Sequence, residues 1–292
     1  MSVHKITYGR RIQGAGLVKP ELPVKRDKWK GSNILSVRYF LMAILGKKRS
    51  GKSTLIYNLL RKFVTKNTIT LFFVNTFYKD DTYALMREYL DQHGLPYIGY
   101  TSILSDDGQV NEIEEFMRVN RGGDEVVEED LPESEAAVEE TPPPKVGVLF
   151  RDEPVEENLP KKRKKKLKPE YLIIIDDNNT ELKDGTLAKL CKQVFHFKAK
   201  VIISTQGVVD INRQIFSQTD YVALFKNFNE VSIKDLYERI QPNIPLGEFW
   251  ELYRSTTDEG VKQKDDTIHY DFLLIDRGKE EYRRNLNLIL NN

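Results

Sequence analysis

The 292-residue chain contains a single cysteine, Cys191, which excludes a framework of disulfide bonds. It also lacks any apolar run of the ~18 residues that a membrane-spanning helix requires. Its first residues, MSVHKITYGRRIQG, contain no apolar stretch typical of a secretory signal. We therefore expect a protein of a reducing compartment that neither spans a membrane nor is secreted, with Cys191 as a small core residue on a helix.

An excess of charge of either sign is absent as well, because 45 Lys and Arg residues against 44 Asp and Glu give a formal net charge of +1. The charge is nevertheless unevenly distributed: residues 124–157 are strongly acidic, and LPKKRKKKLKP follows at 159–169. Such a composition cannot bury enough apolar surface to offset the entropy of ordering. Residues 121–168 are therefore expected to form a disordered insertion in a domain over 36–292, after an N-terminal extension over 1–35.

The basic run within that insertion, PKKRKKK, allows three interpretations. It is typical of a solvated charged surface, of a contact to DNA phosphates and of a nuclear import signal. The sequence does not decide between them.

A more specific pattern is LGKKRSGKST at residues 45–54, directly after the apolar run YFLMAI. Gly46, Gly51, Lys52 and Ser53 match the spacing G-x-x-x-x-G-K-[ST] of a phosphate-binding loop. Glycines permit positive φ and a close approach of backbone N–H groups to phosphates. A helix that follows directs its positive end at the same group.

The surroundings of the loop have the expected pattern, with an apolar strand before it and apolar residues at helical spacing after it. Lys52 is expected to reach the β- and γ-phosphate oxygens of ATP, and the Ser53 hydroxyl to bind Mg²⁺. A chance glycine match in a basic turn is the alternative. The predicted nucleotide-binding residues are Gly46, Lys47, Lys48, Arg49, Ser50, Gly51, Lys52, Ser53 and Thr54.

Two aspartates follow the apolar run LIII at residues 172–175. Ligands of open α/β sheets bind at the carboxyl ends of the strands, so both carboxylates are predicted to face the nucleotide. Asp176 is expected to hold Mg²⁺, and Asp177 to orient and activate the attacking water as general base. The alternative is a pair of carboxylates that only caps a strand end.

A further apolar strand ends in STQG, where Gln206 is predicted to hydrogen-bond both γ-phosphate and water. Ser204 and Thr205 are weaker candidates, and a simple polar turn is the alternative. In P-loop ATPases of the additional-strand class, this strand lies between the phosphate-loop strand and the aspartate strand.

An arginine acting on the developing charge of a phosphoryl transfer is expected as well. Arg213 is the first choice, supplied by a neighbouring subunit, with Arg239 and Arg254 behind it. An ordinary surface arginine is the alternative.

Apolar runs alternate with helical patterns along the rest of the chain, which is typical of a parallel sheet covered on both faces. The predicted fold class is α/β: a RecA-like, additional-strand P-loop ATPase core with a mostly parallel sheet. Strands are predicted at 38–45, 68–77, 96–101, 171–178, 200–206, 221–227 and 271–277. Helices are predicted at 52–63, 78–94 with Gly94 as C-cap, 108–122, 185–195, 232–240, 247–253 and 279–290.

Taken together, GKKRSGKST, IIIDDNN, FHFKAK with a strand ending in STQ, TDYVALFK and FLLIDRGKEEYRRNLNL resemble one known group. They are similar to the genome-packaging ATPases of large eukaryotic DNA viruses and their virophages, in the FtsK–HerA superfamily. The resemblance covers about 36–120 and 170–290. It implies a ring-shaped homo-oligomer that uses ATP and Mg²⁺ to pull double-stranded DNA into a preformed capsid. Its partners would be capsid or portal-vertex proteins in an infected cell.

The resemblance assigns roles to Lys52, Ser53, Asp176, Asp177 and Gln206, and less firmly to Arg213. Many related ATPases have Glu in place of Asp177; because Asp is one methylene shorter, the resemblance leaves open a difference in geometry or in rate. His196 lies near a Gly-Arg-His element of the group but lacks the preceding arginine, and a partly buried histidine at a helix end is the alternative. Lys198, Lys200 and residues 161–168 are candidates for gripping DNA.

Three other functions stay open at this point. One is a different DNA translocase or helicase of the same superfamily. Another is a slow nucleotide-dependent switch or capsid-assembly scaffold, with which Asp177 is compatible. The third is a small-molecule kinase, which would need a lid and an acceptor pocket.

Overall fold

The computed structural model describes residues 29–105, 108–120, 168–177, 181–183, 185–258 and 271–290. Most of the predicted N-terminal extension, residues 1–28, lies outside this part of the chain. So does the predicted insertion, apart from Lys168.

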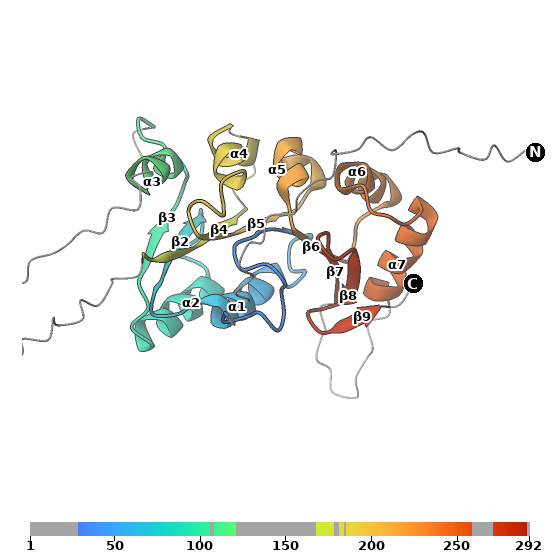
Figure 1. Cartoon of the computed structure of the whole chain (residues 1–292), viewed down its shortest axis with the longest axis horizontal. Helices are drawn as coiled ribbons and strands as arrows, with labels where there is room; N and C mark the ends of the chain where they lie inside the picture. Colours follow the sequence, from blue (N-terminus) through green and yellow to red (C-terminus); the bar gives the residue numbers. More distant parts are fainter. Residues whose placement is uncertain are drawn as a thin grey trace, which may run out of the picture.

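A single sheet organises the described residues, with its nine strands in the order β3-β2-β4-β5-β1-β6-β7-β8-β9 (Figure 1). The six strands from β3 to β6 are parallel, and the last three are antiparallel. The strands are β1 (Leu41–Leu45), β2 (Thr68–Val74), β3 (Tyr97–Tyr100), β4 (Glu170–Asp176), β5 (Ala199–Thr205), β6 (Tyr221–Phe225), β7 (Phe272–Asp276), β8 (Glu281–Arg284) and β9 (Leu288–Leu290).

Helices cover both faces of this sheet, as the alternation of patterns predicts (Figure 1). One face carries α1 (Lys52–Phe63) and α2 (Asp81–Gln92). The other carries α3 (Glu112–Asn120), α4 (Gly185–Cys191), α5 (Arg213–Gln218), α6 (Glu230–Ile240) and α7 (Leu246–Asp258). Because both faces are covered, β1 is buried at every position, which explains its unbroken apolar sequence.

The position of β5 decides the class of fold. It pairs in parallel with β1 on one side and with β4 on the other, so that Ile203 lies opposite both Ala43 and Ile175. One strand therefore separates the strand before the glycine-rich loop from the strand that carries the two aspartates. This arrangement confirms the predicted α/β fold of the additional-strand P-loop type.

The predicted helix over 279–290 is wrong, because this segment forms β8 and β9. Glu280 and Asn285 have φ of 55° and 58°, left-handed values that no helix accommodates. Strand β8 instead pairs with β7, and the buried Arg283 forms an ion pair with Glu281 and donates a hydrogen bond to the carbonyl of Ile34. The contact of Arg283 with Ile34 links residues 249 apart in the sequence, which a local pattern does not reveal.

Two smaller differences concern the helices that flank β5. Helix α4 ends at Cys191, well short of the predicted 195. Helix α5 is not among the predicted elements; it follows the short 3₁₀ turn Val208–Asp210, and Asn212 caps it by accepting from the backbone N–H of Gln214. Gly94, in contrast, follows the end of α2 at φ +59°, as a capping glycine should.

Candidate functional site

The loop between β1 and α1, residues 46–51, has a backbone that only this kind of sequence permits. A Cβ at Gly46 would lie 2.3 Å from the Ser50 hydroxyl and 3.1 Å from the Lys52 side chain. Gly51 has φ 97° and Arg49 φ 63°, so the loop turns sharply before the helix. The N–H of Gly46 donates to the Thr205 carbonyl at 3.1 Å, which fixes the loop to the end of β5.

Lys52 is buried within this loop, with 6% of its surface exposed. Its Nζ donates to the carbonyl of Gly46 at 2.9 Å and to that of Lys47 at 3.4 Å. The first turn of α1 has no capping side chain and no acidic residue, so its positive end is not neutralised locally. An ammonium and a bare helix terminus together form a site suited to an anion such as phosphate.

Other residues of the predicted loop differ in exposure. Lys47, Lys48, Arg49 and Thr54 are exposed, whereas Ser53 is partly exposed in the first turn of α1. The Lys47 ammonium lies 5.2 Å from the centre of the Phe228 ring.

Asp176 ends β4 and lies opposite Ser204 in the neighbouring strand, with 5% of its surface exposed. Its Oδ2 accepts a hydrogen bond from the Tyr83 hydroxyl at 2.6 Å. Its Oδ1 is buried and has no hydrogen-bond partner among the described residues, and the same holds for the Ser204 hydroxyl. Burial raises the pKa of Asp176, while the hydrogen bond from the Tyr83 hydroxyl and the Lys52 charge oppose this rise.

Asp177 and Gln206 meet beside this buried carboxylate. The Gln206 amide lies 3.4 Å from each carboxylate oxygen of Asp177. The backbone N–H of Asp177 donates to the Ser204 carbonyl at 3.2 Å, and its φ of 54° directs the residue away from the strand. Asp177 is exposed, so its carboxylate is accessible to water.

The predicted residues thus converge at the carboxyl edge of the parallel strands. Lys52, Asp176, Asp177 and Gln206 come from three neighbouring strand ends, β1, β4 and β5. Among the described residues, no group of three or more His, Cys, Asp or Glu side chains could hold a metal ion. Mg²⁺ keeps several waters and needs only one or two protein ligands besides phosphate oxygens. The buried, unpartnered Oδ1 of Asp176 fits such a ligand.

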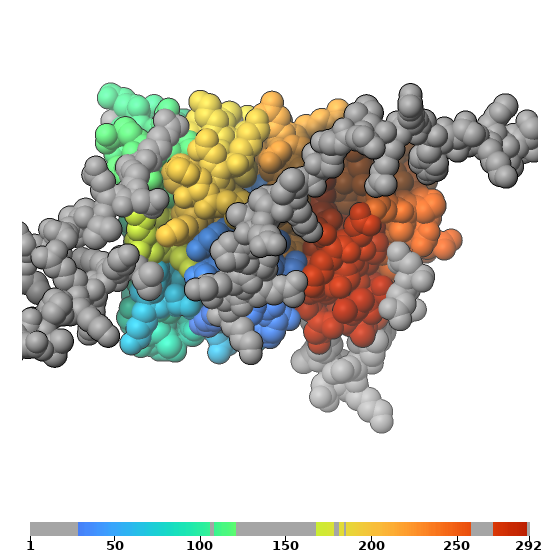
Figure 2. All heavy atoms as spheres, viewed as in Figure 1, coloured from blue at the N-terminus to red at the C-terminus, as the bar shows by residue number. Residues whose placement is uncertain are grey.

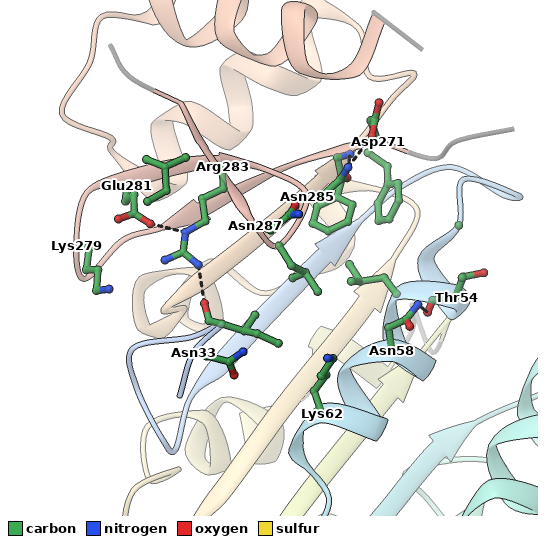
Figure 3. Close-up of a pocket in the computed structure, with 17 residues that line it drawn as sticks. Asn33, Thr54, Asn58, Lys62, Asp271, Lys279, Glu281, Arg283, Asn285 and Asn287 are labelled. Carbon is green, nitrogen blue, oxygen red and sulfur yellow. Dashed lines mark hydrogen bonds and ion pairs between the residues drawn. The ribbon is translucent and has the colours of Figure 1, made fainter. Parts of the chain in front are cut away.

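A cavity of about 870 Å³ adjoins the same loop, between α1 and the C-terminal strands (Figure 3). Gly51, Thr54 and Asn58 line it from the helix, and Phe225 and Asn287 from the opposite side. Figure 2 shows why the two walls are neighbours, since the red C-terminal strands lie directly beside the blue N-terminal part. Local sequence patterns do not reveal this cavity, because its two walls come from parts of the chain far apart in sequence.

The arginine candidates have different surroundings. Arg213 is the first residue of α5, and its side chain is exposed. Arg239 is largely buried: it pairs with Asp235 at 3.0 Å, donates to the Ile211 carbonyl at 3.2 Å and lies over the Phe216 ring. Those contacts give Arg239 a packing role. Arg254 is exposed on α7.

The structure corrects two expectations about cationic side chains. Lys200 is not placed to contact DNA phosphates, because it is buried and its ammonium pairs with the Glu170 carboxylate at 2.6 Å. His196 is exposed, not partly buried.

Cys191 lies in the core as expected, and its burial raises the pKa of the thiol. Thr205 is buried and donates to Asp210 at 2.8 Å, so it does not face a ligand.

Tyr83 is the functional residue that sequence reasoning missed. It belongs to the first turn of α2, 93 residues from the aspartate that it contacts. Only the pairing of β2 with β4 brings them together.

Comparison with known proteins gives structural matches only: no family model and no curated protein matches the chain. One solved structure is the genome packaging NTPase B204 from Sulfolobus turreted icosahedral virus 2 in complex with ATP-gammaS, at 14% identity and a TM-score of 0.45. The match covers 87% of this chain and all of that one; the same protein with AMP scores 0.48 at 13% identity. Another is EccC (ATPases 2 and 3) from Thermomonospora curvata in complex with a signal sequence peptide, at 12% identity and a TM-score of 0.44. That match covers 87% of this chain and 37% of EccC.

At such identities and scores the function has to be argued from the chain's own residues. In the described part of the chain, no helix is long and apolar enough to cross a membrane.

Proposed function

We propose that the chain is an ATPase that binds MgATP at the carboxyl edge of its sheet and uses hydrolysis to move double-stranded DNA. One observation supports this most strongly. An anion-binding loop, a buried carboxylate with a free oxygen and an Asp–Gln pair lie at adjacent strand ends. These are the parts that phosphoryl transfer to water requires.

The residues divide the chemistry between them. Lys52 and the bare N-terminus of α1 gather the negative charge of the β- and γ-phosphates. Asp176, with Ser53, would hold Mg²⁺, which when bound neutralises phosphate charge. Asp177 orients the attacking water and accepts its proton, and the Gln206 amide, bonded to Asp177, fixes that carboxylate.

The nucleoside would occupy the cavity next to the loop. Its volume of about 870 Å³ is within the range of small-molecule sites, roughly 300–1,000 Å³. Phe225, Phe272 and Leu286 supply apolar surface for a base, and Asn58 and Asn287 supply amides for its polar edge.

A ring of identical subunits would complete the site. The exposed Arg213 is then the cation that a neighbouring subunit places on the transferring phosphate. Such a motor would package viral DNA into a capsid in an infected cell. Its partners would be capsid or portal-vertex proteins.

A hydrolysis assay tests this proposal. Phosphate release from MgATP is measured for the full chain and for Lys52→Ala, with and without a linear duplex. Hydrolysis that Lys52→Ala abolishes, and that duplex DNA stimulates, is the expected result. Slow turnover that duplex leaves unchanged would contradict a motor and favour the nucleotide-dependent switch. Equal rates for both proteins would remove Lys52 from the site.

A further inference from the structure

The opposite edge of the sheet, where the parallel strands begin, is strongly cationic. Four segments meet there, residues 29–40, 64–67, 168–171 and 195–200. They contain six lysine and arginine residues and a single carboxylate, Glu170. We call the exposed and partly exposed cations of these segments the cationic edge: Lys30, Arg38, Lys66, Lys168 and Lys198.

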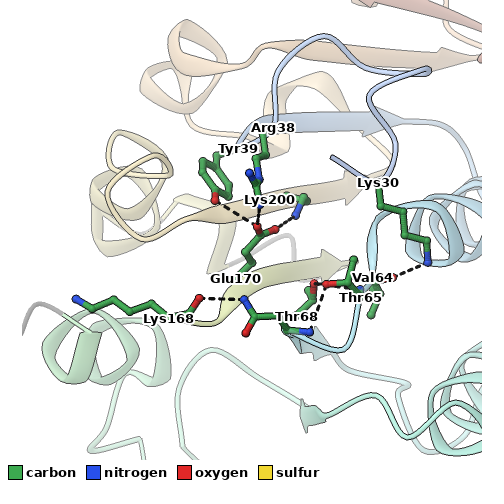
Figure 4. Close-up of polar contacts among 10 residues, drawn as sticks. Lys30, Arg38, Tyr39, Val64, Thr65, Thr68, Lys168, Glu170 and Lys200 are labelled. Carbon is green, nitrogen blue, oxygen red and sulfur yellow. Dashed lines mark hydrogen bonds and ion pairs between the residues drawn. The ribbon is translucent and has the colours of Figure 1, made fainter. Parts of the chain in front are cut away.

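Glu170, the one carboxylate of these four segments, does not neutralise their charge. Glu170 is mostly buried and is shared by Arg38 and the buried Lys200 (Figure 4). Burial alone would raise the pKa of Glu170, but the hydrogen bonds and charges of Lys200 and Arg38 outweigh it and lower the pKa. Two cations on one carboxylate leave the group with a positive charge. Further along the edge, Asp220 accepts from the backbone N–H of Leu41.

Contacts between the four segments place them side by side at this edge. Asn67 donates to the Lys168 carbonyl at 3.0 Å, and the N–H of Tyr171 donates to the Lys198 carbonyl at 3.1 Å. Lys30 donates to the Val64 carbonyl at 2.6 Å (Figure 4). Burial, and after it the like charge of Lys62, lower the pKa of Lys30.

We propose that the cationic edge binds the sugar–phosphate backbone of double-stranded DNA. DNA as the polyanion rests on the proposed function. From β2 through β4 and β5 to β1 the edge spans about 14 Å at the usual strand spacing. A duplex carries about eight phosphate charges over that length. Lysine and arginine contacts of this kind position a duplex without reading its sequence, as a translocating protein requires.

The aromatic residues of this edge favour a duplex over a single strand. Binding of single strands relies on rings on which successive bases stack. The exposed Phe195 ring stands edge-on to Tyr39, at 88°, and His196 stands at 81° to Phe197. Phe195 is 61% exposed, but both ring pairs are edge-on, so neither forms the parallel stack of a platform for successive bases.

The test measures DNA binding without nucleotide, so that it stands apart from ATP hydrolysis. Anisotropy of a fluorescent 24-base-pair duplex of arbitrary sequence gives Kd over a series of salt concentrations. The variant is Lys66→Gln with Lys198→Gln in the full chain. Its charge-matched control is Lys79→Gln with Lys183→Gln, two exposed lysines outside this edge. ATPγS binding, measured separately, reports whether each protein is folded and has its nucleotide site.

We expect the Lys66/Lys198 variant to weaken duplex binding by about tenfold or more and to reduce the salt slope by about 2, roughly 1 for each lysine. The control should bind like the wild type. Equal duplex affinity for the wild type and the Lys66/Lys198 variant, or a wild type that binds no duplex, would overturn the proposal.

Competition experiments test two other polyanions, single-stranded DNA and polyglutamate. A single strand that competes better than the duplex would overturn the choice of double-stranded DNA. Polyglutamate is tested in the same way. If it binds the wild type, binds the Lys66/Lys198 variant more weakly and displaces no duplex, the partner of this edge is an acidic polypeptide and not DNA. A Lys66/Lys198 variant that binds duplex as tightly as the wild type refutes this inference alone, whereas a wild type that binds no ATPγS, or no duplex at all, also refutes the proposed function.

Discussion

Replacing Tyr83 with Phe isolates one hydrogen bond at the candidate metal site. The hydroxyl donates to Asp176 Oδ2 at 2.6 Å, and the two residues are 1% and 5% exposed. The substitution leaves the ring in place, 6.1 Å from Phe72 and 6.0 Å from Phe77. Any effect therefore comes from the lost donor and not from a cavity.

The size of the effect follows from the charge and burial of the acceptor. A hydrogen bond to a charged group contributes about 1.5–3 kcal/mol, and losing it leaves both oxygens of Asp176 buried without a donor. About 2 kcal/mol corresponds to a fall in Tm of about 4–8 °C for a domain of this size. Because the hydroxyl orients a metal ligand, we also expect an affinity for ATPγS about tenfold lower in the presence of Mg²⁺. Without Mg²⁺ the affinity should be unchanged.

Tyr97→Phe is the matched control. Its hydroxyl also donates to a carboxylate, Asp91, but at 3.4 Å and exposed to solvent, and its ring belongs to the same aromatic cluster. Its stability should change by no more than about 0.5 kcal/mol. Thermal unfolding gives the stability, and titration calorimetry with and without Mg²⁺ gives the affinity. A Tyr83→Phe protein that matches the wild type in both measurements would refute the positioning role.

Further predictions concern the proposed general base Asp177, the exposed Arg213 and the ion pair between Glu170 and Lys200. Asp177→Asn should bind MgATPγS normally yet release no phosphate, as rapid-quench assays would show; an equal loss of binding would make Asp177 a metal ligand. Arg213→Ala mixed with wild-type subunits should depress ATPase activity more than in proportion to its fraction, and a linear response would argue against action across an interface. Glu170→Gln leaves Lys200 buried beside a neutral amide, which should cost about 3 kcal/mol in urea unfolding at pH 7. Because the folded pKa of Glu170 is lowered, its contribution is present above the unfolded value of about 4.3 and lost as pH falls through the folded one. The difference between Glu170→Gln and the wild type should therefore shrink on acidification, and a difference constant from pH 7 to pH 3 would contradict this.

Short sequence motifs predict most of the candidate site because each of its parts is formed by residues close together in the sequence. The glycines, Lys52 and the first turn of α1 are consecutive, and a phosphate loop constrains each of them by backbone geometry. The aspartates and Gln206 follow apolar strands, and parallel strands end at a common edge. The pairing of Asp176 with Ser204 is then a consequence of strand order, which the additional-strand class predicts.

What sequence alone does not reveal depends on contacts between distant residues. The segment 279–290 has apolar residues at a spacing that also fits a helix, but Tyr282 and Arg283 are buried against β7 and Ile34. Lys200 looks like a surface lysine until Glu170 and Arg38 are placed beside it. In both cases tertiary pairing overrides local pattern.

The two edges of the sheet are joined by the same two strands. Strand β4 begins at Glu170, within the cationic edge, and ends at Asp176 in the candidate metal site. Strand β5 begins beside Lys198 and ends at Thr205, whose carbonyl holds the phosphate loop. At about 3.3 Å per residue the two sites are about 20 Å apart. Strands β4 and β5 are buried at nearly every position, and a close-packed interior transmits strain, so a coupling between the two edges would run along these strands. If DNA bound at the proposed site changes the affinity for nucleotide, linkage requires that nucleotide change the affinity for DNA by the same factor.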